Sequence, residues 1–265
     1  MLLQPSDLVG CRYRLSQKQR HPDIPPTDTT YARRRRLALA RRQATALLPT
    51  HPQRGDKKLF HRVDLGTLDD AEDRWFATLE ALAAQATIIT DAMLHTTCGG
   101  HAFAVPIDAL VRRPDGNYMP VLITNHRIIR PDPNRSIQVM STRRLGLGTP
   151  NIGHYRLKHH SADSFTLALA NHALADVGHA AQRGILIGQD PEIAVILDTE
   201  LLEQGLQLAL KQPIPAHAHR VKECGTCRFW PHCEAELVER DDLSLLFAGD
   251  KSAQYQREGI ITVAD

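Results

Sequence analysis

The residues of this chain best suited to chemistry are its cysteines. Cys224, Cys227 and Cys233 lie close together near the C-terminus in a C-x2-C-x5-C spacing, in a chain of 265 residues with five cysteines. Three thiolates at such a spacing are typical of a metal centre, which needs a fourth ligand. Cys11, near the N-terminus, is the obvious donor. The spacing therefore predicts one inorganic centre that joins the two ends of the chain.

Two kinds of centre suit four cysteine sulfurs. Zinc binds four sulfurs tetrahedrally and favours paired C-x2-C units, whereas an iron–sulfur cluster accepts unequal spacings with one distant ligand. The distant Cys11 favours the cluster, with zinc as the alternative. The remaining interpretations are unliganded buried thiols and a disulfide. The N-terminus has no apolar segment typical of a signal peptide, which argues against a disulfide and leads us to expect a cytoplasmic protein. Cys98 has no cysteine neighbour and is expected to be an ordinary apolar residue.

This cysteine arrangement resembles that of the RecB-like nucleases, an AddB-related family in which a lone N-terminal cysteine and a C-terminal C-x2-C-x5-C hold a four-iron cluster. The likeness covers most of the chain, including the opening Pro5-Ser6-Asp7-Leu8 and the stretches at 78–81, 105–111 and 118–121. The resemblance implies an α/β core of the PD-(D/E)XK, restriction-endonuclease-like type. It also implies a 4Fe-4S cluster on the four cysteines and metal-dependent hydrolysis of DNA.

The resemblance further implies where a catalytic metal would bind. Hydrolysis of a phosphodiester needs a divalent ion, Mg2+ or Mn2+, held by carboxylates that help it neutralise charge and activate water. The family uses an aspartate on one strand of a hairpin and an Asp/Glu-x-Lys on the next. Asp108 fits the first position, but Ile123 and Asn125 stand where the acid and the lysine would be. A shift of register by one residue does not restore the pair, because it moves the side chains to the opposite face.

Other residues offer partial replacements. His126, with Asn125 and Asp108, forms a candidate mixed nitrogen and oxygen site that suits Mn2+ better than Mg2+. Glu80, on a predicted helix before the sheet, is a second candidate acid, although a lone helix glutamate is usually solvated. The simplest alternative is that Asp108 is a hydrogen-bonded carboxylate of the core.

The periodicity of apolar residues predicts the elements that must position these side chains. Helical spacing predicts helices over 5–20, 30–48, 69–94, 162–177 and 200–210, with a polar loop over 53–70. A period of two predicts strands over 103–112 and 118–129, joined by a turn at Pro114-Asp115-Gly116-Asn117. This hairpin brings Asp108 close to Ile123. A further strand pair is predicted over 184–198.

These elements predict a mixed central sheet flanked by helices, with an iron–sulfur subdomain. The expected parts are an N-terminal helical segment with Cys11 (1–50), a nuclease-like core (51–215) and a cysteine segment (216–240). The tail (241–265) is similar to half of a helix-hairpin-helix unit and retains Gly249 of its usual glycine pair. No stretch is long and apolar enough to suggest a membrane span.

The charge distribution favours DNA as a partner. The net charge of +2 neither requires nor excludes nucleic acid, but Arg33–Arg36 and Arg41-Arg42 gather positive charge in one early segment. A basic loop region from Arg143 to His160 could also follow a phosphate backbone. The sequence therefore predicts a RecB-like nuclease that acts on DNA ends or single strands, with an altered catalytic motif. The alternatives are a catalytically inactive DNA-binding or partner-binding protein on the same fold, and a zinc protein with no nucleic-acid role.

Overall fold

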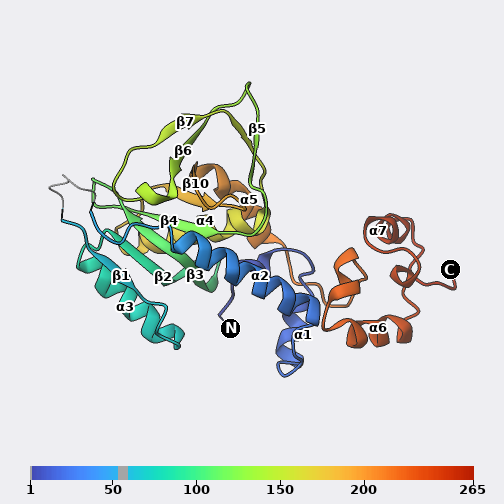
Figure 1. Cartoon of the computed structure of the whole chain (residues 1–265). Coiled ribbons are helices and arrows are strands. Elements are labelled where there is room, and N and C mark those ends of the chain that lie inside the picture. Colours follow the sequence, from blue (N-terminus) through green and yellow to red (C-terminus); the bar gives the residue numbers. More distant parts are fainter. Residues whose placement is uncertain (1, 53–58) are drawn as a thin grey trace. The chain divides into compact units, whose positions relative to one another are not determined.

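The computed structural model describes residues 2–52 and 59–265 (Figure 1). The chain divides into two compact units, each made of segments that are distant in sequence. Unit 1 comprises Met1–Leu8 and Arg36–Lys211, and unit 2 comprises Val9–Arg35 and Gln212–Asp265. In the described part of the chain, every helix is too short or too polar to cross a membrane.

Unit 1 is built on one eight-stranded mixed sheet with the order β1-β2-β3-β4-β9-β10-β6-β7. The pairs β1–β2 and β4–β9 are parallel and the other neighbouring strands are antiparallel. The strands are β1 (Arg62–Asp64), β2 (Ile88–Cys98), β3 (His101–Arg112), β4 (Tyr118–Ile123), β6 (Ile137–Ser141), β7 (Asn151–Gly153), β9 (Arg183–Ile187) and β10 (Ile193–Asp198). A separate two-stranded ribbon pairs β5 (Ile129–Pro131) with β8 (Tyr155–Leu157).

Helices flank this sheet. Those with residues in unit 1 are η1 (Pro5–Leu8), α2 (Asp28–Thr45), α3 (Ala71–Ala83), η2 (Thr142–Arg144), α4 (Ser161–Asp176) and α5 (Glu200–Lys211), where η marks a 3-10 helix. Helix α3 packs against β2, while α4 packs against β2, β3, β4 and β9 and also against α5. The predicted α/β architecture, a mixed sheet flanked by helices, is confirmed.

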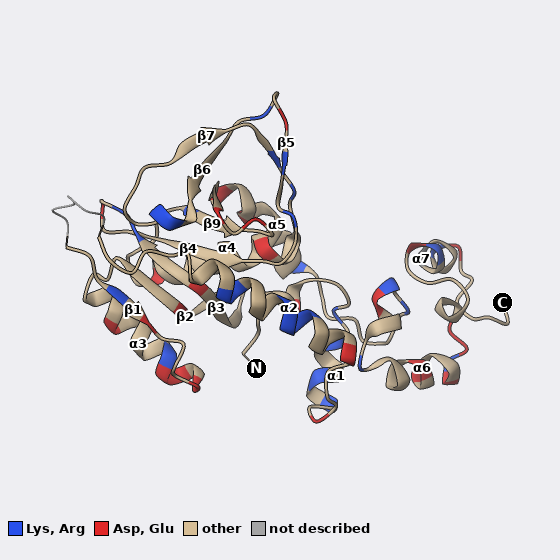
Figure 2. Cartoon of the chain, viewed as in Figure 1, with Lys and Arg blue, Asp and Glu red and all other residues tan. Residues whose placement is uncertain are grey.

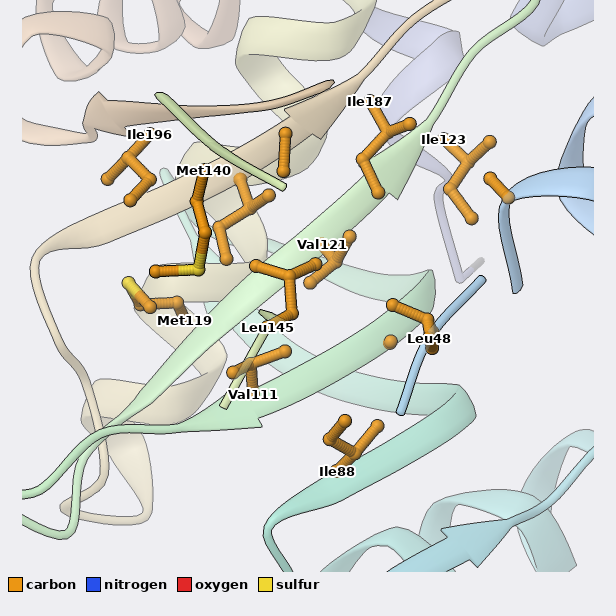
Figure 3. Packing of buried hydrophobic residues seen from close by; sticks show 14 of the residues in the cluster. Leu48, Ile88, Val111, Met119, Val121, Ile123, Met140, Leu145, Ile187 and Ile196 are labelled. Carbon is orange, nitrogen blue, oxygen red and sulfur yellow. The ribbon is translucent and has the colours of Figure 1, made fainter. Parts of the chain in front are cut away.

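The core of unit 1 is a cluster of buried side chains contributed mainly by the central strands (Figure 3). Val111, Val121 and Ile187 are at most 1% exposed and come from three adjacent strands. Leu48, just beyond α2, packs into the same cluster. Branched aliphatic residues fill a pleated surface well, and their burial removes apolar area from water at roughly 25 cal/mol per Å2. The packing of this core therefore fixes the positions of β3 and β4, the strands that carry Asp108 and Ile123.

Unit 2 joins the early segment of the chain to its C-terminal segment. Its elements are α1 (Arg14–Arg20), the first part of α2, η3 (Lys222–Thr226), α6 (Trp230–Glu239), η4 (Leu243–Leu245) and α7 (Asp250–Arg257). Tyr13 packs with Ala218 and Leu237, and its hydroxyl donates to Glu236 Oε2 at 2.6 Å. The backbone N–H of Ala218 donates to Glu236 Oε1 at 2.9 Å. Helix α7 begins directly after Gly249, which has a φ of 70°.

The helix predicted over 69–94 is wrong in its second half. Helix α3 ends at Ala83, Gln85 has a left-handed φ of 56°, and β2 begins at Ile88. Ile88 and Ile89 are completely buried and pair with β3. A strand buried on both faces has a continuous apolar run, which periodicity alone does not distinguish from a buried helix.

The helix predicted over 5–20 is also wrong, because the chain is divided there. Gly10 has a φ of 75° between η1 and α1, so Cys11 lies in the connection and not inside a helix. The hairpin is confirmed by the β3–β4 pairing, although its second strand ends at Ile123. The strand pair over 184–198 and the helices at 162–177 and 200–210 are confirmed by β9, β10, α4 and α5.

The division into two units differs from the four consecutive parts expected from the sequence. Both units combine N-terminal and later segments, so their boundaries fall at residues 8, 35 and 211. The predicted loop over 53–70 contains strand β1, and its residues 53–58 lie outside the described part of the chain.

Candidate functional sites

The structure brings four of the five cysteines into unit 2. Cys11 follows Gly10, Cys224 lies in η3, Cys227 comes directly after η3, and Cys233 lies in the first turn of α6. The backbone N–H of Val221 donates to Cys224 Sγ at 3.3 Å, which is the kind of bond that stabilises a ligating thiolate. The fifth cysteine, Cys98, is buried on β2 in unit 1.

The four thiols influence one another electrostatically. Burial raises the pKa of Cys233 to about 12, with further contributions from Cys227, Cys11 and Cys224. Burial also raises the pKa of Cys224, and Cys11 and Cys227 add to the effect although the Val221 N–H opposes it. Thiolates that repel one another in a partly apolar setting are stabilised when a cationic centre binds between them.

The residues present fit a four-sulfur centre in donor type and number. Cys11 and Cys233 are partly buried and, like Trp230 and Leu245, pack against the apolar cluster of Tyr13, Ala218 and Leu237. Across residues 2–52 and 59–265, no three His, Cys, Asp or Glu side chains already converge tightly enough to hold a metal ion. The four cysteines are therefore a candidate ligand set and not a formed metal site.

Asp108 is a buried carboxylate on β3. Its side chain is 6% exposed, and Oδ2 accepts a hydrogen bond of 2.6 Å from the backbone N–H of Ile123 on β4. Its other oxygen, Oδ1, lies 2.6 Å from Nε of Arg41 on α2, in an ion pair whose geometry is not that of a hydrogen bond. The prediction that Asp108 lies beside Ile123 is confirmed, but the contact is with the amide of Ile123 and not with its side chain.

The pKa of Asp108 shows whether burial or the favourable contacts dominate at this site. Burial raises this pKa from 3.8 to about 6, even though Arg41 and the Ile123 N–H both lower it. Asp91 on β2 raises it further through charge repulsion. Desolvation of the carboxylate therefore outweighs the ion pair.

Asp91 is a residue that the sequence reasoning missed. Its neighbours Thr90 and Ala92 pair with Ala109 and Ile107, so Asp91 stands opposite Asp108 across the two strands. It is exposed, and its left-handed φ of 54° marks an irregularity in β2. The available signal was a single acid in an apolar run, which went unnoticed because the run was predicted to be helical.

The other predicted catalytic residues do not join Asp108. Ile123 is 1% exposed and its side chain belongs to the core. Asn125 and Glu80 are exposed, and within the described residues neither has a side-chain hydrogen bond or ion pair with Asp108. The proposed mixed site of Asp108, Asn125 and His126 is therefore not formed.

His126 belongs to a different cluster. Its Nε2 lies 2.9 Å from Oδ2 of Asp163 on α4, and its ring centroid is 3.9 Å from that of His160. Burial lowers the pKa of His126, with a smaller effect from Lys158, and burial raises the pKa of Asp163 to about 6. Both groups are therefore shifted towards their neutral forms. This cluster connects the end of β4 to the start of α4.

No protein-family model matches the chain, and no curated protein matches it either.

Proposed function

We propose that this chain is a DNA-binding protein on a RecB-like, PD-(D/E)XK-type core in which Arg41 takes the place of a divalent ion at Asp108. The observation that supports this most directly is the ion pair of 2.6 Å between these residues. A guanidinium beside a buried carboxylate supplies the positive charge that a metal would otherwise provide. The centre as built lacks the acid and the lysine that hydrolysis would use.

Local charge supports DNA as the partner. Residues 124–160 contain seven Lys and Arg but a single acid, Asp132. Arg33–Arg36 form a second group of exposed cations on α2. Lys and Arg that contact phosphates release counterions, so the affinity for DNA should fall steeply with salt.

An iron–sulfur cluster in unit 2 is part of this proposal, with zinc as the alternative. Cys11, Cys224, Cys227 and Cys233 would hold it, and four thiolates satisfy a [4Fe–4S] centre. Asp108 and the DNA-facing cations of residues 124–160 belong to unit 1, so we assign the cluster a structural role.

One observation favours metal-dependent cleavage of DNA as a second candidate function. Asp91 and Asp108 stand opposite each other on β2 and β3, and two neighbouring carboxylates are a minimal ligand set for Mg2+ or Mn2+. The side chain of Arg41 is 41% exposed, so it has room to leave Asp108 for a DNA phosphate.

The two candidates are separated by measuring binding and cleavage of single-stranded and blunt duplex DNA with Mg2+ or Mn2+. We expect salt-sensitive binding without strand cleavage. Cleavage that is lost in both Asp108→Ala and Asp91→Ala, and retained in the exposed-acid control Asp69→Ala, would instead establish the nuclease. A protein with neither binding nor cleavage would contradict both candidates.

A further inference from the structure

The ribbon of β5 and β8 carries two arginines, Arg130 and Arg156, directly opposite each other. We propose that its cationic face is the surface that contacts the backbone of duplex DNA, an inference that rests on the proposed DNA binding. The ribbon stands out from the main sheet (Figure 1), and Lys and Arg follow its two strands (Figure 2).

The register of the ribbon gives it two different faces. Ile129 pairs with Leu157 and Pro131 with Tyr155, and these pairs alternate with Arg130 opposite Arg156. Ile129, Leu157 and Tyr155 are half-buried, whereas Arg130 and Arg156 are exposed. Because side chains alternate between faces along a strand, the arginines share the face opposite to that of Ile129, Leu157 and Tyr155.

This cationic face extends beyond the arginine pair. The N–H of Lys158 donates to the carbonyl of Ile128 at 2.7 Å, which continues the pairing to the base of the ribbon, where exposed Lys158 lies two residues from Arg156 and opposite buried Ile128. The cationic face is defined here as Arg130, Arg156 and Lys158. Neighbouring cations two residues apart on a strand are separated by about 7 Å, which is within the Debye length at physiological salt. They therefore act on an approaching anion as one stripe of charge.

The arginine pair is unfavourable for the ribbon by itself. Like charges directly opposite each other destabilise a strand pair. Arg156 is compensated by Asp132, whose Oδ2 lies 2.9 Å from its Nε. Within the described residues, Arg130 and Lys158 have no Asp or Glu at ion-pair distance. An external anion between the strands would remove the repulsion.

The shape of the ribbon selects the kind of anion. A two-stranded ribbon fits the major groove of duplex DNA, whose walls are rows of phosphates. The tip of the connection from β5, Asp132-Pro133-Asn134-Arg135, carries no large apolar side chain, so it offers nothing to insert into a lipid surface. Duplex DNA therefore fits the ribbon better than a membrane does.

The test compares two charge-matched double variants of the full chain. Arg130→Gln/Lys158→Gln removes two cations of the cationic face, and Arg183→Gln/Lys211→Gln removes two exposed cations of unit 1 that lie outside this face and outside α2. We expect the ribbon variant to weaken duplex binding roughly tenfold or more at 0.1 M salt and to reduce the salt slope by about 1.8, since each lost phosphate contact lowers it by about 0.9. The Arg183→Gln/Lys211→Gln control should bind within about threefold of wild type. Arg130→Lys, which keeps the charge, should bind like wild type.

The outcomes separate this inference from the proposed function. Salt-dependent DNA binding that the ribbon variant leaves unchanged would overturn the ribbon and leave DNA binding intact. A wild-type protein that does not bind DNA would overturn both. The ribbon variant should melt at or above the wild-type temperature because a like-charge pair is gone, and a lower melting temperature would mean that these cations serve folding instead.

Discussion

At the scale of single residues, Asp108 shows how the protein accommodates a buried carboxylate. The carboxylate has both a guanidinium and a backbone N–H as partners, yet its pKa is raised to about 6. A buried ion pair often fails to recover the full desolvation cost of its members. Asp108 is therefore kept at some expense of stability, and its ionised form depends on Arg41.

This balance predicts a dependence of stability on pH. The pKa of Asp108 is raised from 3.8 to about 6 on folding, so protonation stabilises the fold fully below about pH 4, and this gain is lost as pH rises through 6. When the pH is lowered from 7 to 4, the free energy of unfolding of wild type should rise by on the order of 1–3 kcal/mol more than that of Asp108→Asn, which has no carboxyl group to protonate at this position. Urea unfolding at several pH values measures this. Asp69→Asn, an exposed acid, is the control, and parallel curves for wild type and Asp108→Asn would contradict the prediction.

Arg41→Met tests the other half of the ion pair. Without the guanidinium the pKa of Asp108 should rise further, so the variant should lose roughly 1–2 kcal/mol above pH 7 and regain most of it near pH 4. The same unfolding series measures the loss. Arg42→Met, which changes the exposed neighbouring arginine, is the control. An equal loss of unfolding free energy in Arg41→Met at pH 7 and pH 4 would show that Arg41 acts only through packing.

At the scale of elements, the segment 124–160 is anchored where it leaves and rejoins the sheet. His126 contacts Asp163 and His160 at the start of α4, and Ile128 is buried against Gly188 after β9. These contacts hold the base of the ribbon while its cationic face stays exposed. A charged ribbon can therefore project from the sheet without a core of its own.

The closeness of Gly188 to this anchor predicts a packing defect. A Cβ at Gly188 would lie 2.6 Å from Ile128 Cγ1 and 3.0 Å from the His126 carbonyl oxygen. Gly188→Ala should therefore destabilise the protein by about 1–3 kcal/mol, measured by thermal or urea unfolding. Gly205→Ala on α5, where the new Cβ would be 3.6 Å from Phe165 Cε1, is the matched control and should raise stability by about 0.5–1 kcal/mol. Equal melting temperatures for Gly188→Ala and wild type would show that the anchor is loose.

At the scale of the whole molecule, both ends of the chain meet within unit 2. Glu236 accepts hydrogen bonds from Tyr13, in the early segment, and from Ala218, in the late segment. Cys11 comes from the first of these segments and the other three thiols from the second. A centre bound to all four would close a loop of roughly two hundred residues, which stabilises by restricting the unfolded chain.

Cysteine substitution tests this centre. Cys11→Ala should abolish the broad visible absorbance of anaerobically purified protein and lower the melting temperature, whereas Cys98→Ala should keep the absorbance. Metal analysis of the same samples distinguishes iron from zinc. Colourless wild-type protein with one bound zinc would favour the alternative, and protein without either metal would contradict a metal centre in unit 2.

The sequence by itself determined most of the elements and the residue types available for chemistry. Cysteine spacing pointed to a four-sulfur set, and alternating apolar residues with a Pro-Asp-Gly-Asn turn located the hairpin beside Asp108, because these signals are local. Only the tertiary structure decided what surrounds each side chain. The strand at Ile88, the opposition of Asp91 and Asp108, the ion pair with Arg41 and the association of His126 with Asp163 depend on contacts between residues far apart in sequence, and no local pattern encodes which distant partner will neutralise a buried charge.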